Sequence, residues 1–217
     1  MSYADTANPN APVSLVEKWD KTFAESTQVD HRKVTFPNRY GITLVGDLYI
    51  PKDRGDRKLA AIAVSGPFGA VKEQSSGLYA QTLAEQGFVT LAFDPSYTGE
   101  SGGYPRNVAS PDINTEDFSA AVDFLGLQKE VDRNRIGLLG ICGWGGMALN
   151  DAAMDTRVKA VATSVMYDMS RAMGHGVGDG KDRYTTADRR AVLQYLNTQR
   201  WKDAENGAFA PGGHHIY

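Results

Sequence analysis

The sequence contains a single cysteine, Cys142, among 217 residues. One thiol cannot close an intramolecular disulfide, so disulfide stapling is excluded and a reducing compartment fits best. No apolar run approaches the ~20 residues of a membrane-spanning helix. Residues 1–12 also lack the charged and then apolar pattern of a signal peptide. We therefore expect a cytoplasmic chain that does not associate with membranes.

A basic patch is missing as well. The formal net charge is -3, and lysine and arginine form no block. Nucleic acids and anionic surfaces are bound through such blocks, so neither is an expected partner. Nothing in the sequence implies a metal ion or an organic cofactor.

Short apolar segments alternate with helical patterns over most of the chain. The segments typical of strands are 34–36, 42–50, 59–64, 88–93, 135–140 and 158–165. Those from residue 59 onward show no polar alternation, which is typical of strands buried on both faces. The pattern predicts an α/β fold with a mostly parallel central sheet that helices cover on both faces.

The two ends of the chain differ from this core. Residues 1–30 are predicted to form a leader and then a helix, because Ser14 and Glu17 have capping-box spacing and Trp19 and Phe23 share one helical face. The core is expected to span residues 31–168.

Residues 169–217 are predicted to form a partial lid or tail over the core. Four glycines between residues 171 and 183 indicate a loop. The run Thr185-Thr186-Ala187-Asp188 is predicted to cap a following helix, and no element is expected after residue 207.

The lone cysteine lies where an apolar segment gives way to glycines. The run 135–140 is predicted to be a buried strand, and Trp144, Met147 and Ala148 begin a helical pattern. Cys142 is therefore expected at the tip of a tight turn, at the carboxyl end of a strand and the N-terminus of a helix. The helix dipole and its unpaired N–H groups favour negative charge there, as a nucleophile and its oxyanion require.

Two further loops are expected beside this turn. Residues 65–69 and 94–103 each follow a predicted parallel strand, as does the turn at 142–146. Ligands of parallel sheets bind at the carboxyl ends of the strands. The three loops together thus predict a site at this edge of the sheet. Asp94 is expected to bond backbone N–H groups of its own loop.

The run Gly140-Ile141-Cys142-Gly143-Trp144-Gly145-Gly146 resembles the nucleophile elbow of the α/β-hydrolase superfamily. The chain is most similar to dienelactone hydrolases and related bacterial hydrolases with a cysteine nucleophile, over residues 33–168. Trp144 departs from the pattern, because a small residue usually stands two positions after the nucleophile. The resemblance implies an α/β-hydrolase-like sheet. The usual last strands are not visible after residue 165, so the chain is expected to be shortened.

The resemblance also implies roles for single residues. Cys142 would attack the carbonyl of an ester, thioester or lactone, which makes a small acyl substrate the expected partner. The N–H of Gly143 would be one oxyanion donor, and Phe68 the other, because Pro67 has no N–H. Dienelactone hydrolases carry a glutamate in this loop. Here the position is Gly66, so their way of gating the thiol is not expected.

A base and an acid are harder to assign. His214 and His215 are the candidate bases and Asp168 the candidate acid, while His31 and His175 are the remaining histidines. None of the histidines follows a recognisable strand. An alternative is therefore a catalytically incomplete relative or a small-molecule binder, whose exposed sheet edge would allow self-association.

A dinucleotide-binding protein is the other alternative. Gly143, Gly145 and Ala148 match the Gly-x-Gly-x-x-Ala fingerprint, and Asp168 follows at about the spacing of a ribose-binding acid. That fingerprint normally follows the first strand of its fold. Here at least four strands precede it, so the hydrolase is favoured.

Overall fold

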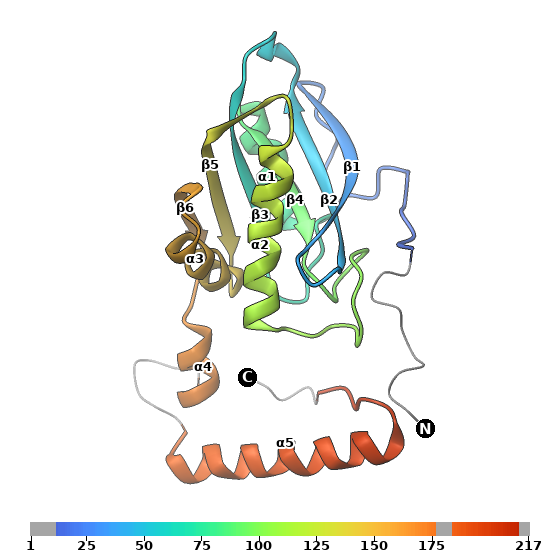
Figure 1. The fold of residues 1–217 in the computed structure, drawn as a ribbon, viewed down its shortest axis with the longest axis vertical. Helices are drawn as coiled ribbons and strands as arrows, with labels where there is room; N and C mark the ends of the chain where they lie inside the picture. Colours follow the sequence, from blue (N-terminus) through green and yellow to red (C-terminus); the bar gives the residue numbers. More distant parts are fainter. Residues whose placement is uncertain (1–11, 177–183, 213–217) are drawn as a thin grey trace. The chain divides into compact units, whose positions relative to one another are not determined.

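The computed structural model describes residues 12–176 and 184–212 (Figure 1). The chain divides into two compact units, and the boundary falls between Tyr167 and Asp168.

The first unit is built on a six-stranded sheet. Its strands are β1 (Val29–Pro37), β2 (Thr43–Pro51), β3 (Leu59–Ser65), β4 (Val89–Asp94), β5 (Val131–Ile141) and β6 (Val158–Ser164). Their order in the sheet is β1-β2-β4-β3-β5-β6. β3, β4, β5 and β6 run parallel, whereas β2 pairs antiparallel with both β1 and β4. The predicted mostly parallel sheet is confirmed.

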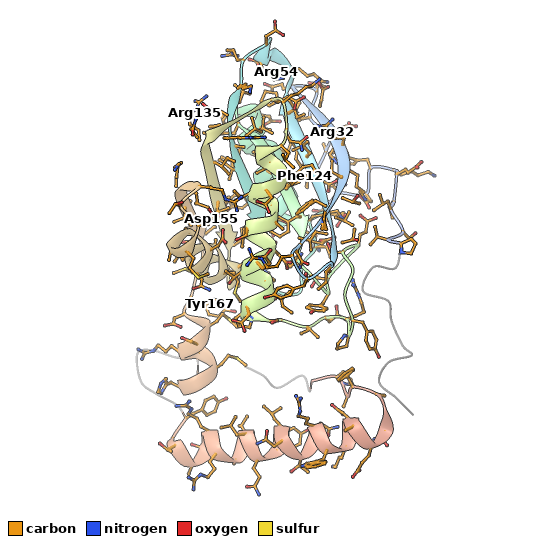
Figure 2. The ribbon with its side chains drawn as sticks, in the orientation of Figure 1. Arg32, Arg54, Phe124, Arg135, Asp155 and Tyr167 are labelled. Carbon is orange, nitrogen blue, oxygen red and sulfur yellow. The ribbon has the colours of Figure 1, made fainter. Side chains whose placement is uncertain are left out.

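Helices cover both faces of this sheet (Figure 1). α1 (Ser75–Glu85) packs on one face, where Ala80 and Ala84 meet Val64 and Leu139. α2 (Pro111–Gly126) and α3 (Trp144–Met154) pack on the other face. Phe124 of α2, labelled in Figure 2, stacks on Phe36 of β1 with ring centroids 5.0 Å apart. The sheet is apolar on both faces because both are covered.

α2 begins at a proline. Its first residue is Pro111, and Ser110 is the N-cap residue. Proline fits the first helical position because its missing N–H needs no partner there. Asn114 still serves this end of the helix, since its side-chain oxygen accepts a hydrogen bond from the Ser110 N–H at 2.8 Å.

The predicted N-terminal helix is wrong, because residues 12–28 contain no helix. Trp19 packs edge-on against His31 of β1, with centroids 5.1 Å apart. Lys21 reaches the buried carboxylate of Asp47 at 3.1 Å. Ion pairs and ring contacts with the sheet therefore hold this segment extended, and they override a local capping pattern that is worth only ~1 kcal/mol.

The second unit contains α4 (Met169–His175) and α5 (Thr186–Asn206). The predicted loop at 171–183 is thus partly helical. The predicted cap of α5 is confirmed, because Thr185 and Asp188 form a reciprocal capping box. α5 buries no residue. In the described part of the chain, no helix combines the length and apolarity needed to cross a membrane.

Candidate active site

Cys142 occupies a strained turn between β5 and α3. Its φ is 58°, a left-handed conformation that side chains other than glycine rarely adopt. Its N–H donates to the Ser164 carbonyl at 2.8 Å, which ties the turn to the end of β6. The side chain is half-buried. A strained residue between a strand and a helix is the geometry of a nucleophile elbow.

Glycines allow the helix to approach the strand at this turn. A Cβ on Gly140 would lie 2.4 Å from the Trp144 carbonyl oxygen and 2.6 Å from Gly145 Cα. A Cβ on Gly145 would lie 2.7 Å from the Met166 side chain. A larger residue would therefore displace the turn itself at position 140 and the Met166 side chain at position 145.

The unusual Trp144 is accommodated by the loop after β3. Gly66 has a φ of 100°, and a Cβ there would lie 2.4 Å from both the Trp144 ring and the Ile141 carbonyl oxygen. The Phe68 ring packs on the Trp144 indole with centroids 5.2 Å apart. The loop after β3 thus packs against the elbow through Trp144.

The two predicted oxyanion donors lack partners. Within residues 12–176 and 184–212, neither the Gly143 N–H nor the Phe68 N–H donates a hydrogen bond. Neighbouring amides do so, since the Gly145 N–H donates to the Cys142 carbonyl at 3.0 Å. Both amides therefore remain available to an oxygen outside the chain.

Asp94 is the last residue of β4 and is fully buried. Its carboxylate accepts hydrogen bonds from the N–H groups of Lys72 at 2.8 Å and Glu100 at 2.9 Å. The expected bonding to its own loop is confirmed by Glu100. The bond from Lys72 is an addition, because it ties in the loop that carries Phe68.

Lys72 is the residue that the sequence analysis missed. It is the only charged residue between positions 65 and 72, and its ammonium is fully buried. The ammonium contacts Asp94 Oδ2 at 2.9 Å, Glu100 Oε2 at 2.6 Å, and Glu73. Burial opposes its charge, but these carboxylates hold the pKa of Lys72 above its usual value.

The candidate acid has another role in the structure. Asp168 is the N-cap residue of α4, and it accepts hydrogen bonds from the Arg171 N–H at 2.9 Å and the Ser170 hydroxyl at 2.6 Å. The Ser170 hydroxyl and the Arg171 amide lower the pKa of Asp168. Because the Asp168 carboxylate caps α4, its place in the structure also gives no support to a ribose-binding role.

The histidines do not complete a triad in the described residues. His31 Nε2 pairs with Asp47 Oδ1 at 2.7 Å. His175 is the last residue of α4. His214 and His215 lie outside the described residues. Among the residues that are described, the Cys142 sulfur takes part in no hydrogen bond.

Comparison with known proteins identifies the family. The model of the PET hydrolase-like family matches residues 4–201. The chain belongs to the PET hydrolase-like family. This membership favours a hydrolase over the dinucleotide-binding alternative.

Three relatives illustrate the similarity. The uncharacterized protein PA2218 of Pseudomonas aeruginosa is 67% identical over 94% of this chain and 54% of its own length. The uncharacterized protein YcjY of Escherichia coli is 39% identical over 83% of this chain and 59% of its own. The thiohydrolase aneE of Aspergillus aculeatus is 33% identical over 63% of this chain and 42% of its own. The chain thus spans about half the length of these relatives.

Solved structures agree on the fold. The crystal structure of PA2218 matches 92% of this chain and 61% of that chain, with a TM-score of 0.88 and 68% identity. The α/β hydrolase GrgF from Penicillium matches 82% of this chain and 56% of its own, with a TM-score of 0.68 and 24% identity. The expected α/β-hydrolase fold is confirmed.

Proposed function

We propose that this chain acts as a hydrolase of esters or thioesters, with Cys142 as the nucleophile. The observation that carries the proposal is the strained elbow, where Cys142 has a φ of 58°. The N–H groups of Gly143 and Phe68 lie on the adjoining turns and have no acceptor among the described residues. Membership of a hydrolase family and the similarity to a thiohydrolase support it.

The reaction follows from the chemistry of these groups. The Cys142 sulfur attacks the carbonyl carbon, and the carbonyl oxygen takes up the negative charge. The N–H groups of Gly143 and Phe68 stabilise this oxyanion, and one such donor is worth ~3 kcal/mol. The tetrahedral intermediate expels the alcohol or thiol and leaves the acyl group on Cys142. Water then hydrolyses the acyl-enzyme with the help of a base.

His214 or His215 is the proposed base, with Asp168 as the proposed acid. A base deprotonates the attacking thiol and later the attacking water, so its loss slows both half-reactions. Replacing each histidine with glutamine separately tests the assignment. The base is the histidine whose loss abolishes deacylation, and the proposal for both fails if deacylation persists in each variant.

The proposed mechanism has no counterpart of the glutamate that gates the thiol in dienelactone hydrolases. The matching position is Gly66, where even a Cβ would lie 2.4 Å from the Trp144 ring. A glutamate has no room there. The proposed substrates are therefore esters and thioesters that need no carboxylate in this loop.

Intact-mass analysis tests the nucleophile. The protein is treated with p-nitrophenyl acetate, and the Cys142→Ala variant serves as the control. We expect one acetyl group on the original protein and none on the variant. Failure of the original protein to take up acetyl, under conditions that acetylate a free thiol, would remove the proposal.

A second candidate is a chain that acylates but completes its cycle only with further polypeptide. Within the described residues, β6 is an edge strand whose Ala160, Ala162 and Thr163 are exposed. The opposite edge, β1, instead presents exposed charged residues such as Asp30 and Arg32, and Arg32 is labelled in Figure 2. Charges protect a sheet edge from pairing, and β6 lacks this protection on most of its length.

Turnover separates the two candidates. An acyl-enzyme that accumulates without steady release of product, together with self-association in gel filtration, supports the incomplete chain. Steady turnover by a monomer excludes it.

A further inference from the structure

The loop between β3 and α1, residues 66–74, is fixed where it begins. The Ser65 hydroxyl donates to the Phe93 carbonyl at 3.1 Å. The next residue, Gly66, is buried and packs directly against the Ile141 carbonyl and the Trp144 ring. The start of the loop therefore cannot shift without displacing the elbow.

The loop is fixed again at Lys72. The Lys72 N–H donates to Asp94 Oδ1, and the Lys72 ammonium donates to Asp94 Oδ2. One carboxylate thus holds both ends of the same residue. The Lys72 carbonyl lies against α1 so closely that a Cβ on Gly77 would be 2.2 Å from its oxygen. Lys72 is consequently held from the β4 side and from the α1 side.

Phe68 lies between these two fixed points and has little support of its own. Its N–H donates no hydrogen bond within the described residues, and its ring packs on Trp144. The loop has one internal backbone bond near it, from the Ala70 N–H to the Pro67 carbonyl at 3.2 Å. The position of the Phe68 peptide is therefore set by the ends of the loop.

We propose that Lys72 is a positioning residue for the reaction: by binding the carboxylates of Asp94, Glu100 and Glu73, it holds the Phe68 N–H where the oxyanion forms. This inference rests on the function proposed above. Lys72 does not touch the substrate. Its effect passes through the three residues that separate it from Phe68.

The charges around Lys72 explain why a lysine is needed. Three carboxylates meet its ammonium, and Lys33 adds a second positive charge at 2.6 Å from Glu100 Oε2. Removal of the Lys72 charge would leave buried Asp94 facing Glu73 and Glu100 without its own cationic partner, because Lys33 contacts Glu100 and Glu73 rather than Asp94. Repulsion between the carboxylates would then separate the two loops. An ammonium or guanidinium satisfies the cluster, whereas an apolar side chain does not.

A pair of reagents separates positioning from folding. Acylation by p-nitrophenyl acetate passes through an oxyanion, whereas disulfide exchange with 5,5′-dithiobis(2-nitrobenzoic acid) does not. The ratio of the two rate constants at Cys142 therefore reports the oxyanion donors and cancels changes in thiol access. Lys21→Met is the matched control, because Lys21 is also a buried lysine but pairs with Asp47 instead of with the carboxylates around Lys72.

We expect Lys72→Met to lower this ratio by about tenfold, since a displaced oxyanion donor loses much of its effect. Lys72→Arg should restore part of the ratio, and Lys21→Met should leave it unchanged. If Lys72→Met does not fold, as judged by circular dichroism, Glu100→Gln weakens the same cluster and should lower the ratio by a smaller factor.

An unchanged ratio in the folded Lys72 and Glu100 variants would overturn the inference. An equal fall in Lys21→Met would also overturn it, because the effect would then be general destabilisation. If Cys142 of the unaltered protein is not acylated at all, the proposed function itself fails. These outcomes differ, so the two proposals are tested separately.

Discussion

The two faces of the sheet hold their buried carboxylates in different ways. On the α1 face, Asp47 and Asp94 are paired with cationic side chains. On the α2 and α3 face, Asp117 and Asp151 receive hydrogen bonds only from neutral donors. All four residues are almost fully buried, so their partners rather than their exposure make the difference.

Charge balance dominates on the α1 face. Asp47 lies 3.1 Å from the Lys21 ammonium and 2.7 Å from His31 Nε2. Burial opposes its ionisation, yet the hydrogen bond from His31 and the charge of Lys21 lower the pKa of Asp47. Lys72 plays the same part for Asp94. Buried charges of this kind persist only in pairs.

Neutral donors suffice for Asp117 on the opposite face. Its carboxylate accepts from the amides of Asn38 and Asn114, and from the hydroxyl and N–H of Ser96, at 2.7–3.0 Å. Burial still raises its pKa. Asp151 has a single donor, Ser119, and its Oδ2 has no partner within the described residues. Burial raises the pKa of Asp151 to about 6.

The contrast explains how the site is supported. Both Asp94 and Asp117 hold the loop after β4, but only Asp94 also holds the loop that carries Phe68. The ionic cluster joins two loops at the candidate site, whereas the neutral network joins a loop to the outer helix α2. We therefore expect substitutions in the ionic cluster to lower the stability of the fold more than substitutions in the neutral network.

Lys72→Met should have the largest effect on stability. It leaves buried carboxylates unpaired, and removing one partner of a buried ion pair typically costs ~3–5 kcal/mol. Urea unfolding measures the change, with the exposed Lys58→Met as control, which should lie within ~0.5 kcal/mol of the original protein. Similar values for the two variants would show that the cluster does not hold the fold.

Asp94→Asn and Asp117→Asn compare the two faces directly. The first change removes the charge that Lys72 requires, so we expect a loss near that of Lys72→Met. The second change leaves a neutral network, but the new side-chain NH2 group at position 117 faces one of the donors that the carboxylate accepted from. Such an unsatisfied buried pair costs ~1–3 kcal/mol. Unfolding in urea at pH 7 measures both. A greater loss for Asp117→Asn would reverse the proposed ranking of the two faces.

Asp151→Asn should have the smallest effect and the clearest pH dependence. The pKa of Asp151 is about 6 in the folded chain, above its ordinary value of 3.8. The folded state therefore binds the extra proton, and stability from this group is lost as the pH rises through 6. The loss is on the order of 1 kcal/mol. Asp151→Asn should therefore reduce the fall in the free energy of unfolding between pH 5 and pH 7, two values that bracket this pKa.

The exposed Asp30→Asn serves as the control for this pH dependence and should leave the curve unchanged. A slope that survives in Asp151→Asn would assign the titration to another group.

Local patterns predicted most of the sheet and the elbow. The strands at 59–64 and 88–93 were recognisable because both of their faces are apolar, and the elbow because its glycines are adjacent in sequence. The N-terminal helix was predicted wrongly, since its capping signal is local and the ion pair between Lys21 and Asp47 is not.

The supports of the site could not be read from the sequence. Lys72 and Asp94 lie 22 positions apart, and Asn38 and Asp117 lie 79 apart. Only the pairing of the strands brings these residues together. No spacing rule marks such a pair, because the loops between strands differ in length and carry many other polar residues.

The most direct test compares Cys142 in the folded chain with Cys142 in the urea-unfolded chain. The measured quantity is the rate constant for acylation by p-nitrophenyl acetate divided by that for disulfide exchange with 5,5′-dithiobis(2-nitrobenzoic acid). We expect a ratio about a hundredfold higher in the folded chain, because Gly143 and Phe68 stabilise the oxyanion only there. Equal ratios in the two states would contradict it.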